Sequence, residues 1–350
     1  MIEQAELRPG YAISRVIRGN WQLAGGHGAI DEESALDALA AAFDAGLTTF
    51  DCADIYTGVE ALIGAFRARL AKRSGAEAAR TLRIHTKLVP DLDRLATISK
   101  PYVESIVDES LRRLGVERLD LVQFHWWDYA VPGAVEALLW LDEIRAAGKI
   151  HLVGGTNFDS VHTAAILDAG VPLATMQTQY SLLDGRPGNG LAALCAARDV
   201  ALLCYGTVAG GFLGDRWLGQ AEPTAPLENR SLTKYKLIID DFGGWAPFQE
   251  LLLACRCIAD RHGVDIATVA SRFALDRPGV KAVIVGGRSP EHARANAAIG
   301  ALRLTPRDLA DLDAVLSRRQ GPEGDTYALE RDRTGRHGAV MKYNLNATPH

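Results

Sequence analysis

The chain has 350 residues, of which 48% are hydrophobic and 23% are charged, and its net charge is −5. This apolar content suffices for a large core and excludes a disordered chain, while scattered basic residues without a Lys/Arg block argue against a nucleic-acid surface. The longest apolar runs are far shorter than the ~18 residues of a membrane span, so neither membrane nor nucleic acid is expected as a partner.

The N-terminus and the cysteines indicate a reducing compartment. Residues 1–10 (MIEQAELRPG) open with acidic and polar residues and lack the apolar stretch of a secretion signal. The five cysteines are an odd number without the spacing of a disulfide framework, which fits free thiols. Cys255 and Cys257 lie in a helical run, where packing explains them, and no spacing typical of a zinc site occurs. We therefore expect a cytoplasmic protein without a metal.

Short apolar runs alternate along the chain with longer segments of helical periodicity. In chain order, strands are expected at 17–21, 48–51, 81–87, 118–125, 149–157, 173–180, 200–206 and 280–287. Helices are expected at 31–46, 60–73, 99–115, 131–148, 160–170, 186–199, 248–263, 265–277, 290–300 and 306–317. The stretch 207–245 shows no clear period and is expected to be irregular.

Eight strands, each followed by helical material, predict a (β/α)8 TIM barrel of the α/β class. The length suits one domain over 1–350, with an extended loop after the seventh strand and a tail, 320–350, packed on or near the barrel. The rival is a doubly wound nucleotide-binding fold, which needs a G-x-G-x-x-G turn after an early strand. Gly25, Gly26 and Gly28 do not have this spacing and are interpreted as a flexible turn.

Ionisable residues follow three successive strands at their carboxyl ends. Asp51, Lys87 and His125 each end an apolar run, and Tyr56 follows Asp51 in the loop TFDCADIYTGVE (49–60). Taken singly, each has a simple structural role, such as a helix cap, a surface charge or a core histidine. In a barrel, however, the carboxyl ends of the strands meet at one face, where chemistry is placed. Because unpaired buried charge is costly, these groups together predict a catalytic site.

These residues resemble the signature of the aldo-keto reductase superfamily. The resemblance rests on FDxADxY with a following glutamate, on a lysine that ends the third strand and on QFH at the end of the fourth, and it runs from Gly19 to Asn296. It implies a catalytic tetrad of Asp51, Tyr56, Lys87 and His125.

Within this resemblance, Tyr56 is the general acid of carbonyl reduction. Lys87, paired with Asp51, lowers the barrier by stabilising the developing phenolate. His125 hydrogen-bonds the substrate carbonyl or shares in the proton transfer, so that Tyr56 and His125 form the oxyanion site towards which hydride is delivered.

The resemblance also implies a binding site for a nicotinamide cofactor. Family members hold the carboxamide with a Ser/Thr-Asn pair and a Gln, stack an aromatic residue on the ring and cover the pyrophosphate with a loop of small residues. The residues expected to contact the cofactor here are Gly19, Asn20, Trp21, Asp51, Thr156, Asn157, Gln177, Tyr205, Gly206, Thr207, Val208, Gly211, Arg288, Ser289, His292 and Asn296.

The adenosine end of this predicted site departs from the commoner family pattern. Gly286 and Gly287 replace the Lys-Ser that often grips the 2′-phosphate, and His292 stands where an arginine is usual. Arg288 still supplies the positive charge that a phosphate needs, so NADPH (NADP) is preferred over NADH.

Tryptophans crowd the rim of the same site. Trp21 and Trp126 are expected to join Tyr56 and His125 in walling a pocket for a planar or sugar-like substrate. Trp127 has two interpretations of equal weight, as a plug of the barrel mouth or as part of that wall.

The predicted function is therefore reduction of a small aldehyde or ketone by NADPH, or the reverse oxidation. Two alternatives stay open. A barrel aldolase would use Lys87 as a Schiff-base nucleophile, although the neighbouring Asp51 favours a charged, paired lysine. A cofactor-binding sensor with slow turnover would resemble the β subunits of voltage-gated potassium channels, which the intact tetrad opposes. The sequence leaves the substrate, the physiological direction and the oligomeric state undecided.

Overall fold

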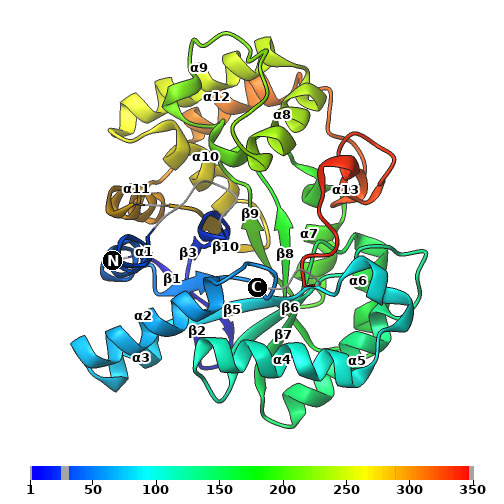
Figure 1. Ribbon diagram of the computed structural model, residues 1–350. Coiled ribbons are helices and arrows are strands. Elements are labelled where there is room, and N and C mark those ends of the chain that lie inside the picture. The colour runs from blue at the N-terminus through cyan, green and yellow to red at the C-terminus, as the bar shows by residue number, and fades with distance from the viewer. Residues whose placement is uncertain (1, 25–30, 288, 347–350) are drawn as a thin grey trace.

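The computed structural model describes residues 2–24, 31–287 and 289–346, and these contain the predicted closed barrel. Parallel strands join in the order β10-β3-β4-β5-β6-β7-β8-β9, which confirms the (β/α)8 fold of the α/β class (Figure 1). The turn interpreted at Gly25, Gly26 and Gly28 lies outside the described residues.

Each predicted barrel strand is present, and burial on both faces explains why the strands are nearly continuous apolar runs. The strands are β3 (Val16–Gly19), β4 (Thr49–Asp51), β5 (Arg83–Leu88), β6 (Leu119–Phe124), β7 (Ile150–Thr156), β8 (Leu173–Gln179), β9 (Ala201–Tyr205) and β10 (Val280–Val285). Every residue of β3 and of β8 is buried. β7 carries Gly154 where it meets β8, since a Cβ there would lie 2.2 Å from Thr175 Oγ1.

The described residues form thirteen α-helices, and each predicted helix is present among them. They are α1 (Glu32–Asp44), α2 (Val59–Ser74), α3 (Ala76–Thr81), α4 (Lys100–Leu114), α5 (Ala134–Ala146), α6 (Ser160–Asp168), α7 (Leu191–Ala197), α8 (Arg230–Phe242), α9 (Trp245–His262), α10 (Ile266–Leu275), α11 (Pro290–Ala301), α12 (Pro306–Leu316) and α13 (Ala328–Arg331). Local sequence explains several starts. Asp31 accepts a hydrogen bond from Ser34 N, and Thr305 and Asp308 form a capping box at α12.

The prediction of an irregular stretch over 207–245 was wrong in its second half, where α8 forms and α9 begins. Asn229 caps α8 by accepting from Leu232 N. The apolar side of α8 packs with α9, α10 and α12 in a cluster separate from the main barrel core, and Figure 1 shows these helices grouped together. The signal was present in the sequence, because the apolar residues recur at helical spacing: Leu232, Tyr235, Ile238, Ile239 and Phe242.

An N-terminal hairpin, which the sequence analysis did not predict, closes the amino end of the barrel. β1 (Gln4–Arg8) pairs antiparallel with β2 (Tyr11–Ser14). Ile13 is buried in one cluster with inward-facing barrel residues such as Leu203. Arg8 donates to Leu173 O, at the start of β8, at 3.0 Å. The hairpin therefore lies at the end opposite to the carboxyl ends of the strands.

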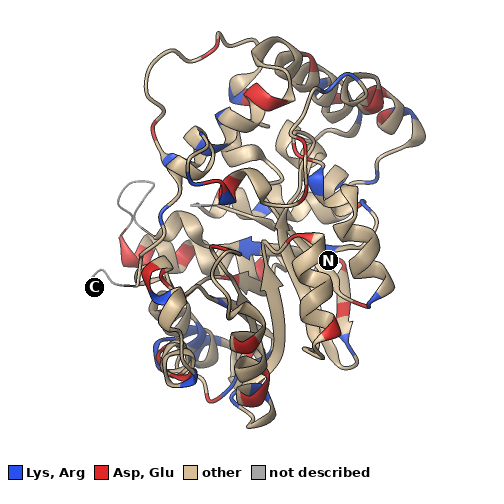
Figure 2. Cartoon of the chain, turned by 90° about the vertical axis from the view of Figure 1, so that its right-hand side faces the viewer, with Lys and Arg blue, Asp and Glu red and all other residues tan. Residues whose placement is uncertain are grey.

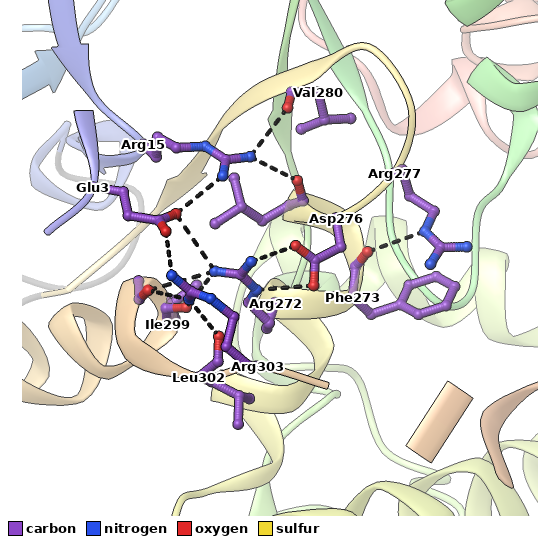
Figure 3. Close-up of polar contacts among 12 residues, drawn as sticks. Glu3, Arg15, Arg272, Phe273, Asp276, Arg277, Val280, Ile299, Leu302 and Arg303 are labelled. Carbon is purple, nitrogen blue, oxygen red and sulfur yellow. Dashed lines mark hydrogen bonds and ion pairs between the residues drawn. The ribbon is translucent and has the colours of Figure 1, made fainter. Parts of the chain in front are cut away.

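A cluster of charges fixes the first residues of the chain to the last barrel helices (Figure 3). Glu3 lies 3.0 Å from Arg15 and 3.8 Å from Arg272, and it also pairs with Arg303. Arg272, buried on α10, pairs in addition with Asp276 at 2.5 Å. One carboxylate thus joins the hairpin to α10 and to the end of α11, which indicates a structural role for this cluster.

The tail packs on the barrel face at which the strands end. In α13, Glu330 forms two 3.0 Å hydrogen bonds with Arg186. Further on, Asn346 Nδ2 donates to Val89 O, just beyond β5, at 2.8 Å. In Figure 1 the tail, in red, runs past α13 and back towards β5 and β6.

The surface carries charges of both signs. Figure 2 shows acidic and basic residues interspersed over the helices rather than gathered in a block of one sign. Within the part of the chain that the structure describes, no helix is both long and apolar enough to span a bilayer.

Candidate active site

The carboxyl ends of the barrel strands surround a cavity of about 310 Å³. Every barrel strand contributes a lining residue at or near its end: Gly19, Asp51, Lys87, His125, Thr156, Gln177, Tyr205 and Ile284. Tyr56, from the loop after β4, lines the same cavity. The structure thus brings together the four side chains predicted to form a tetrad.

Asp51 and Lys87 form a buried ion pair. Lys87 Nζ lies 2.7 Å from Asp51 Oδ2 and donates also to Cys52 O at 2.9 Å. Gln177 Nε2 donates to the other carboxylate oxygen of Asp51 at 2.7 Å. Burial lowers the pKa of Lys87, but the negative charge of Asp51 more than offsets this effect, so the pKa is raised. Lys87 is therefore an ammonium at physiological pH.

Tyr56 presents its phenol to the cavity beside this ion pair. Lys87 Nζ lies 5.2 Å from the centre of the Tyr56 ring, and the ring of Trp21 packs against Tyr56 at 4.9 Å. Burial raises the pKa of Tyr56 to about 12, although the charge of Lys87 acts in the opposite direction. The phenol is thus protonated at neutral pH, and a cation lies close enough to stabilise a phenolate when it forms.

His125 is buried and neutral. Burial, and then the charge of Arg331, lower its pKa to about 3. Its Nδ1 lies 3.1 Å from Thr156 O, and because a carbonyl oxygen can only accept a hydrogen bond, Nδ1 carries the proton. Nε2 has no partner among the described residues and is left as an acceptor.

This tautomer changes the predicted role of His125. A neutral imidazole with its proton on Nδ1 has no N–H for a substrate carbonyl. The geometry therefore does not support His125 as a donor of an oxyanion site, and it suits acceptance of a hydrogen bond from a hydroxyl group instead. Of the two residues predicted to face the carbonyl oxygen, Tyr56 is the one with a proton to give.

The structure places two neighbouring tryptophans differently from the prediction. Trp126 does not line the cavity, because it is buried in its own loop and its Nε1 donates to Asp128 O and Val131 O at 2.9 and 3.0 Å. The prediction that Trp126 walls the substrate pocket was therefore wrong. Trp127 lines the cavity instead and packs edge-on against His125, with ring centres 4.3 Å apart. Successive side chains of an extended segment point to opposite sides.

The groups predicted to hold the nicotinamide lie together along the cavity wall. Asn157 has a left-handed backbone with φ 62°, and its Oδ1 accepts from the Tyr205 hydroxyl at 2.8 Å. Gly206 has a positive φ of 74°, and a Cβ there would lie 2.3 Å from the Tyr235 hydroxyl. The predicted cofactor contacts that line the cavity are Gly19, Asn20, Trp21, Asp51, Thr156, Asn157, Gln177, Tyr205, Gly206, Thr207 and Val208. Gly211 does not line it.

Ser289, His292 and Asn296, which are predicted to contact the adenosine end, do not line this cavity. Arg288 lies outside the described residues. Ser289 Oγ lies 2.9 Å from His292 Nδ1, and Asn296 Nδ2 donates to Gly286 O at 3.0 Å. Asn296 thus holds the turn that follows β10, while the other two residues pair with one another at the start of α11.

The sequence analysis missed the residues that α8 and the tail bring to the cavity. They are Arg230, Ser231, Lys234, Tyr235, Tyr327, Val340, Met341, Lys342 and Leu345. A helical period identifies a helix but does not tell which opening of the barrel it covers. The tail has no period at all, so its contacts with the cavity left no local signal.

Arg331, also in the tail, fixes the loops that carry two of the predicted site residues. Its guanidinium donates to Trp127 O at 3.0 Å, to Asn157 O at 2.8 Å and also to Trp126 O. Hydrogen bonds from a charged donor are stronger than neutral ones. Arg331 therefore holds the loop after His125 and the loop at Asn157 in fixed positions relative to one another.

Neither a metal nor a reactive thiol is indicated at the cavity. Across the described ranges, no group of three or more His, Cys, Asp or Glu side chains could hold a metal ion. Cys52, which follows Asp51, is a free cysteine, and burial raises the pKa of its thiol. It therefore stays protonated.

Comparisons with known proteins agree with this geometry. The sequence pattern of the Aldo/keto reductase family matches residues 15–317. The chain is 28% identical to aldo-keto reductase YhdN of Bacillus subtilis, over 88% of this chain and 91% of that protein. It is 26% identical to an NADH-specific methylglyoxal reductase of Escherichia coli, over 91% of this chain and 96% of that one. It is 29% identical to flagellar radial spoke protein 5 of Chlamydomonas reinhardtii, over 64% of this chain but 49% of that protein.

A solved structure shows the same fold. A glycerol dehydrogenase from Gluconobacter oxydans superimposes with a TM-score of 0.75 at 22% identity, over 90% of this chain and 95% of that one. Because the family pattern covers the barrel from the start of β3 to the end of α12, the chain belongs to the aldo/keto reductase family of oxidoreductases.

Proposed function

We propose that this protein reduces small aldehydes or ketones with a nicotinamide cofactor, NADPH rather than NADH, and also catalyses the reverse oxidation. The observation that carries the proposal is the Tyr56 phenol beside the Lys87–Asp51 pair, in the same cavity as the amides of Asn157 and Gln177. The first group of residues suits protonation of a carbonyl oxygen, and the amides suit recognition of a carboxamide.

The cavity wall fits a nicotinamide by the chemistry of its donors. Thr156, Asn157 and Gln177 offer hydroxyl and amide groups at adjacent strand ends, and the ring of Tyr205 lies beside them. Gly206 places no side chain between the wall and a ligand. When bound, the cofactor supplies the hydride that the protein itself lacks.

The residues of the chain manage the proton. In reduction, Tyr56 gives its phenolic proton to the carbonyl oxygen while hydride adds to the carbon, and Lys87 stabilises the resulting phenolate. Asp51 keeps Lys87 charged, and Gln177 holds Asp51 in place. In oxidation, the phenolate takes the proton of the alcohol. His125, as an acceptor, orients a substrate through a hydroxyl group.

A substrate screen tests this function. Oxidation of NADPH and of NADH should be followed with a panel of aldehydes, ketoses and pyridoxal-like carbonyls, and we expect turnover with at least one of these classes. Quenching of tryptophan fluorescence would show in the same samples whether the cofactor binds. Binding without any turnover across the panel would contradict the reductase function and favour a sensor.

The state of Lys87 opposes an aldolase. A Schiff-base lysine must be a free amine, whereas Lys87 is held as an ammonium by the 2.7 Å contact with Asp51. Borohydride added with substrate should therefore leave the protein unmodified. A lysine adduct detected by mass spectrometry would overturn this conclusion.

The tail supplies part of the cavity wall, which supports one functional domain over residues 1–350. Arg331 connects the tail to the barrel through its hydrogen bonds to two loops of the site.

Replacing Arg331 with methionine should lower kcat/KM for reduction at least about tenfold, because a displacement of catalytic groups by ~1 Å lowers the rate strongly. Steady-state kinetics would measure the loss, and thermal melts would show whether the variant folds.

The matched control for this variant is Arg333→Met. Arg333 lies in the same tail but is half-exposed and pairs with Asp128 at 2.9 Å. It should keep nearly full activity. Equal kcat/KM for the Arg331 and Arg333 variants would mean that Arg331 does not position the loops, and recovery of activity in Arg331→Lys would support its role as a donor.

The sequence analysis predicts a preference for NADPH over NADH because Arg288 can bind the 2′-phosphate. Replacing it with alanine should weaken NADPH binding by roughly 1.5–3 kcal/mol, the range for hydrogen bonds to charged groups, and leave NADH binding nearly unchanged. Both dissociation constants follow from quenching of tryptophan fluorescence, since Trp21 lines the cavity. Arg294→Ala, in the exposed first turns of α11, is the control.

Two results would contradict this assignment. Equal weakening of both cofactors in Arg288→Ala would mean that the side chain only packs against the adenine. A wild-type enzyme that prefers NADH, as the name of the methylglyoxal reductase relative states for that protein, would mean that Gly286 and Gly287 mark the loss of a phosphate site.

A further inference from the structure

We infer that the substrate carries an anionic group, a carboxylate or a phosphate, and that Lys234 of α8 binds it. This inference rests on the proposed reductase function and adds the chemical class of the substrate. The other anion that could enter this cavity is the pyrophosphate of the cofactor, and the experiment below separates the two sources.

The charge of the cavity wall favours an anion. Asp51 and Lys87 cancel one another, and the other charged residues that line the cavity in the described part of the chain are Arg230, Lys234 and Lys342. A cavity with an excess of one charge and low-dielectric walls concentrates ligands of the opposite charge. A neutral aldehyde would gain nothing from these cations.

Lys234 is the least exposed of these three cations, and its ammonium forms no hydrogen bond with the residues that the structure describes. Its side chain is 14% exposed, and the nearest carboxylate oxygen, Glu330 Oε1, lies 3.9 Å away, beyond hydrogen-bond distance. Arg186 pairs with both Asp184 and Glu330, so Glu330 balances the charge of Lys234, but its oxygens already accept two 3.0 Å hydrogen bonds from Arg186. Within the described residues, the ammonium of Lys234 therefore has donors that an entering anion can use.

Three tyrosine rings surround this ammonium. Its distances to the ring centres of Tyr205, Tyr235 and Tyr327 are 5.4, 5.4 and 5.6 Å. Ring faces stabilise a cation but do not replace the hydrogen bonds that water gives it at the surface. Burial accordingly lowers the pKa of Lys234. An anionic oxygen at this position would replace the hydrogen bonds with water that the ammonium loses on burial.

The position of Lys234 suits the remote end of a short substrate. The ring of Tyr327 lies near both Lys234 and His125, since its centre is 5.6 Å from the ammonium and 5.6 Å from the His125 ring. Because both contact the same tyrosine ring, Lys234 and the tetrad residue His125 lie close enough together for one short substrate to reach both.

Matched pairs of substrates test the inference. Succinic semialdehyde is compared with its methyl ester, and D-glyceraldehyde 3-phosphate with D-glyceraldehyde. In the wild type, kcat/KM should be at least about tenfold higher for the anionic member of one pair, the effect of one charge-assisted hydrogen bond. In Lys234→Met this ratio should fall to about threefold or less, and Lys234→Arg should keep most of it.

The matched control is Lys236→Met. Lys236 lies on the same helix, does not line the cavity and pairs with Asp240 and Glu222 at 2.5 and 2.7 Å. Its substitution should leave the ratio of the two kcat/KM values unchanged. Dissociation constants of NADPH and NADH, measured for each variant by fluorescence quenching, complete the experiment.

Each other outcome would overturn the inference. Equal kcat/KM for the anionic and the neutral member of each pair would show that the substrate needs no anionic group. This result would leave the reductase function intact, because only a lack of turnover across the whole carbonyl panel would contradict that function. An unchanged ratio in Lys234→Met with weaker binding of both cofactors would assign Lys234 to the pyrophosphate. An unchanged ratio with a lower melting temperature would make Lys234 a structural counter-ion of Glu330.

Discussion

Replacing Tyr56 with phenylalanine should lower kcat for carbonyl reduction at least about 100-fold, the lower end of what general acid catalysis contributes. Phenylalanine keeps the ring that packs against Trp21 at 4.9 Å and removes the acidic proton. His125 cannot take over, because its Nδ1 proton is engaged by Thr156 O and its pKa is lowered to about 3 by burial. Cofactor affinity should change little, since little volume is lost.

Single-turnover kinetics at saturating cofactor would isolate the chemical step from product release in this variant. Tyr102→Phe is the matched control, because Tyr102 lies on α4 and does not line the cavity. If Tyr56→Phe retained kcat within a few-fold of the wild type, another group would have to protonate the carbonyl oxygen.

The barrel could be predicted because its strands are buried on both faces and read as apolar runs separated by helical periods. The N-terminal hairpin could not. Its first strand, Gln4–Arg8, is short and partly exposed, so its alternation is weak, and the turn signal Pro9-Gly10 alone does not define a hairpin. Burial under the barrel, which stabilises the hairpin, is a tertiary property that a local pattern does not contain.

The tetrad could be predicted because the carboxyl ends of all barrel strands lie at one face. A charged residue at the end of an apolar run must therefore lie at that face. The placement of Trp126 and Trp127 could not, because a step of one residue in an extended segment reverses the side to which a ring points. Lys234 and Arg331 lie on a helix and a tail whose docking depends on packing between distant segments. The tautomer of His125 depends on a carbonyl from another strand.

Replacing Lys87 with methionine should lower kcat at least about 100-fold and also destabilise the fold. The variant leaves Asp51 buried without its 2.7 Å partner, and breaking a buried ion pair costs ~3–5 kcal/mol of unfolding free energy. It also removes the charge that lowers the pKa of Tyr56, so that the phenol becomes a weaker acid. Urea unfolding and steady-state kinetics would measure the two losses separately.

The double variant Asp51→Asn/Lys87→Met separates these effects. It removes the unpaired carboxylate, so the unfolding free energy should largely recover, whereas kcat should stay low because the cation is still missing. Alcohol oxidation gives a second readout, since it needs Tyr56 as phenolate. Wild-type kcat/KM should rise as the pH approaches about 12, the pKa of Tyr56, and that of Lys87→Met should be lower at every pH. If the pH profiles of the wild type and of Lys87→Met superimposed, Lys87 would have no role in the proton transfer.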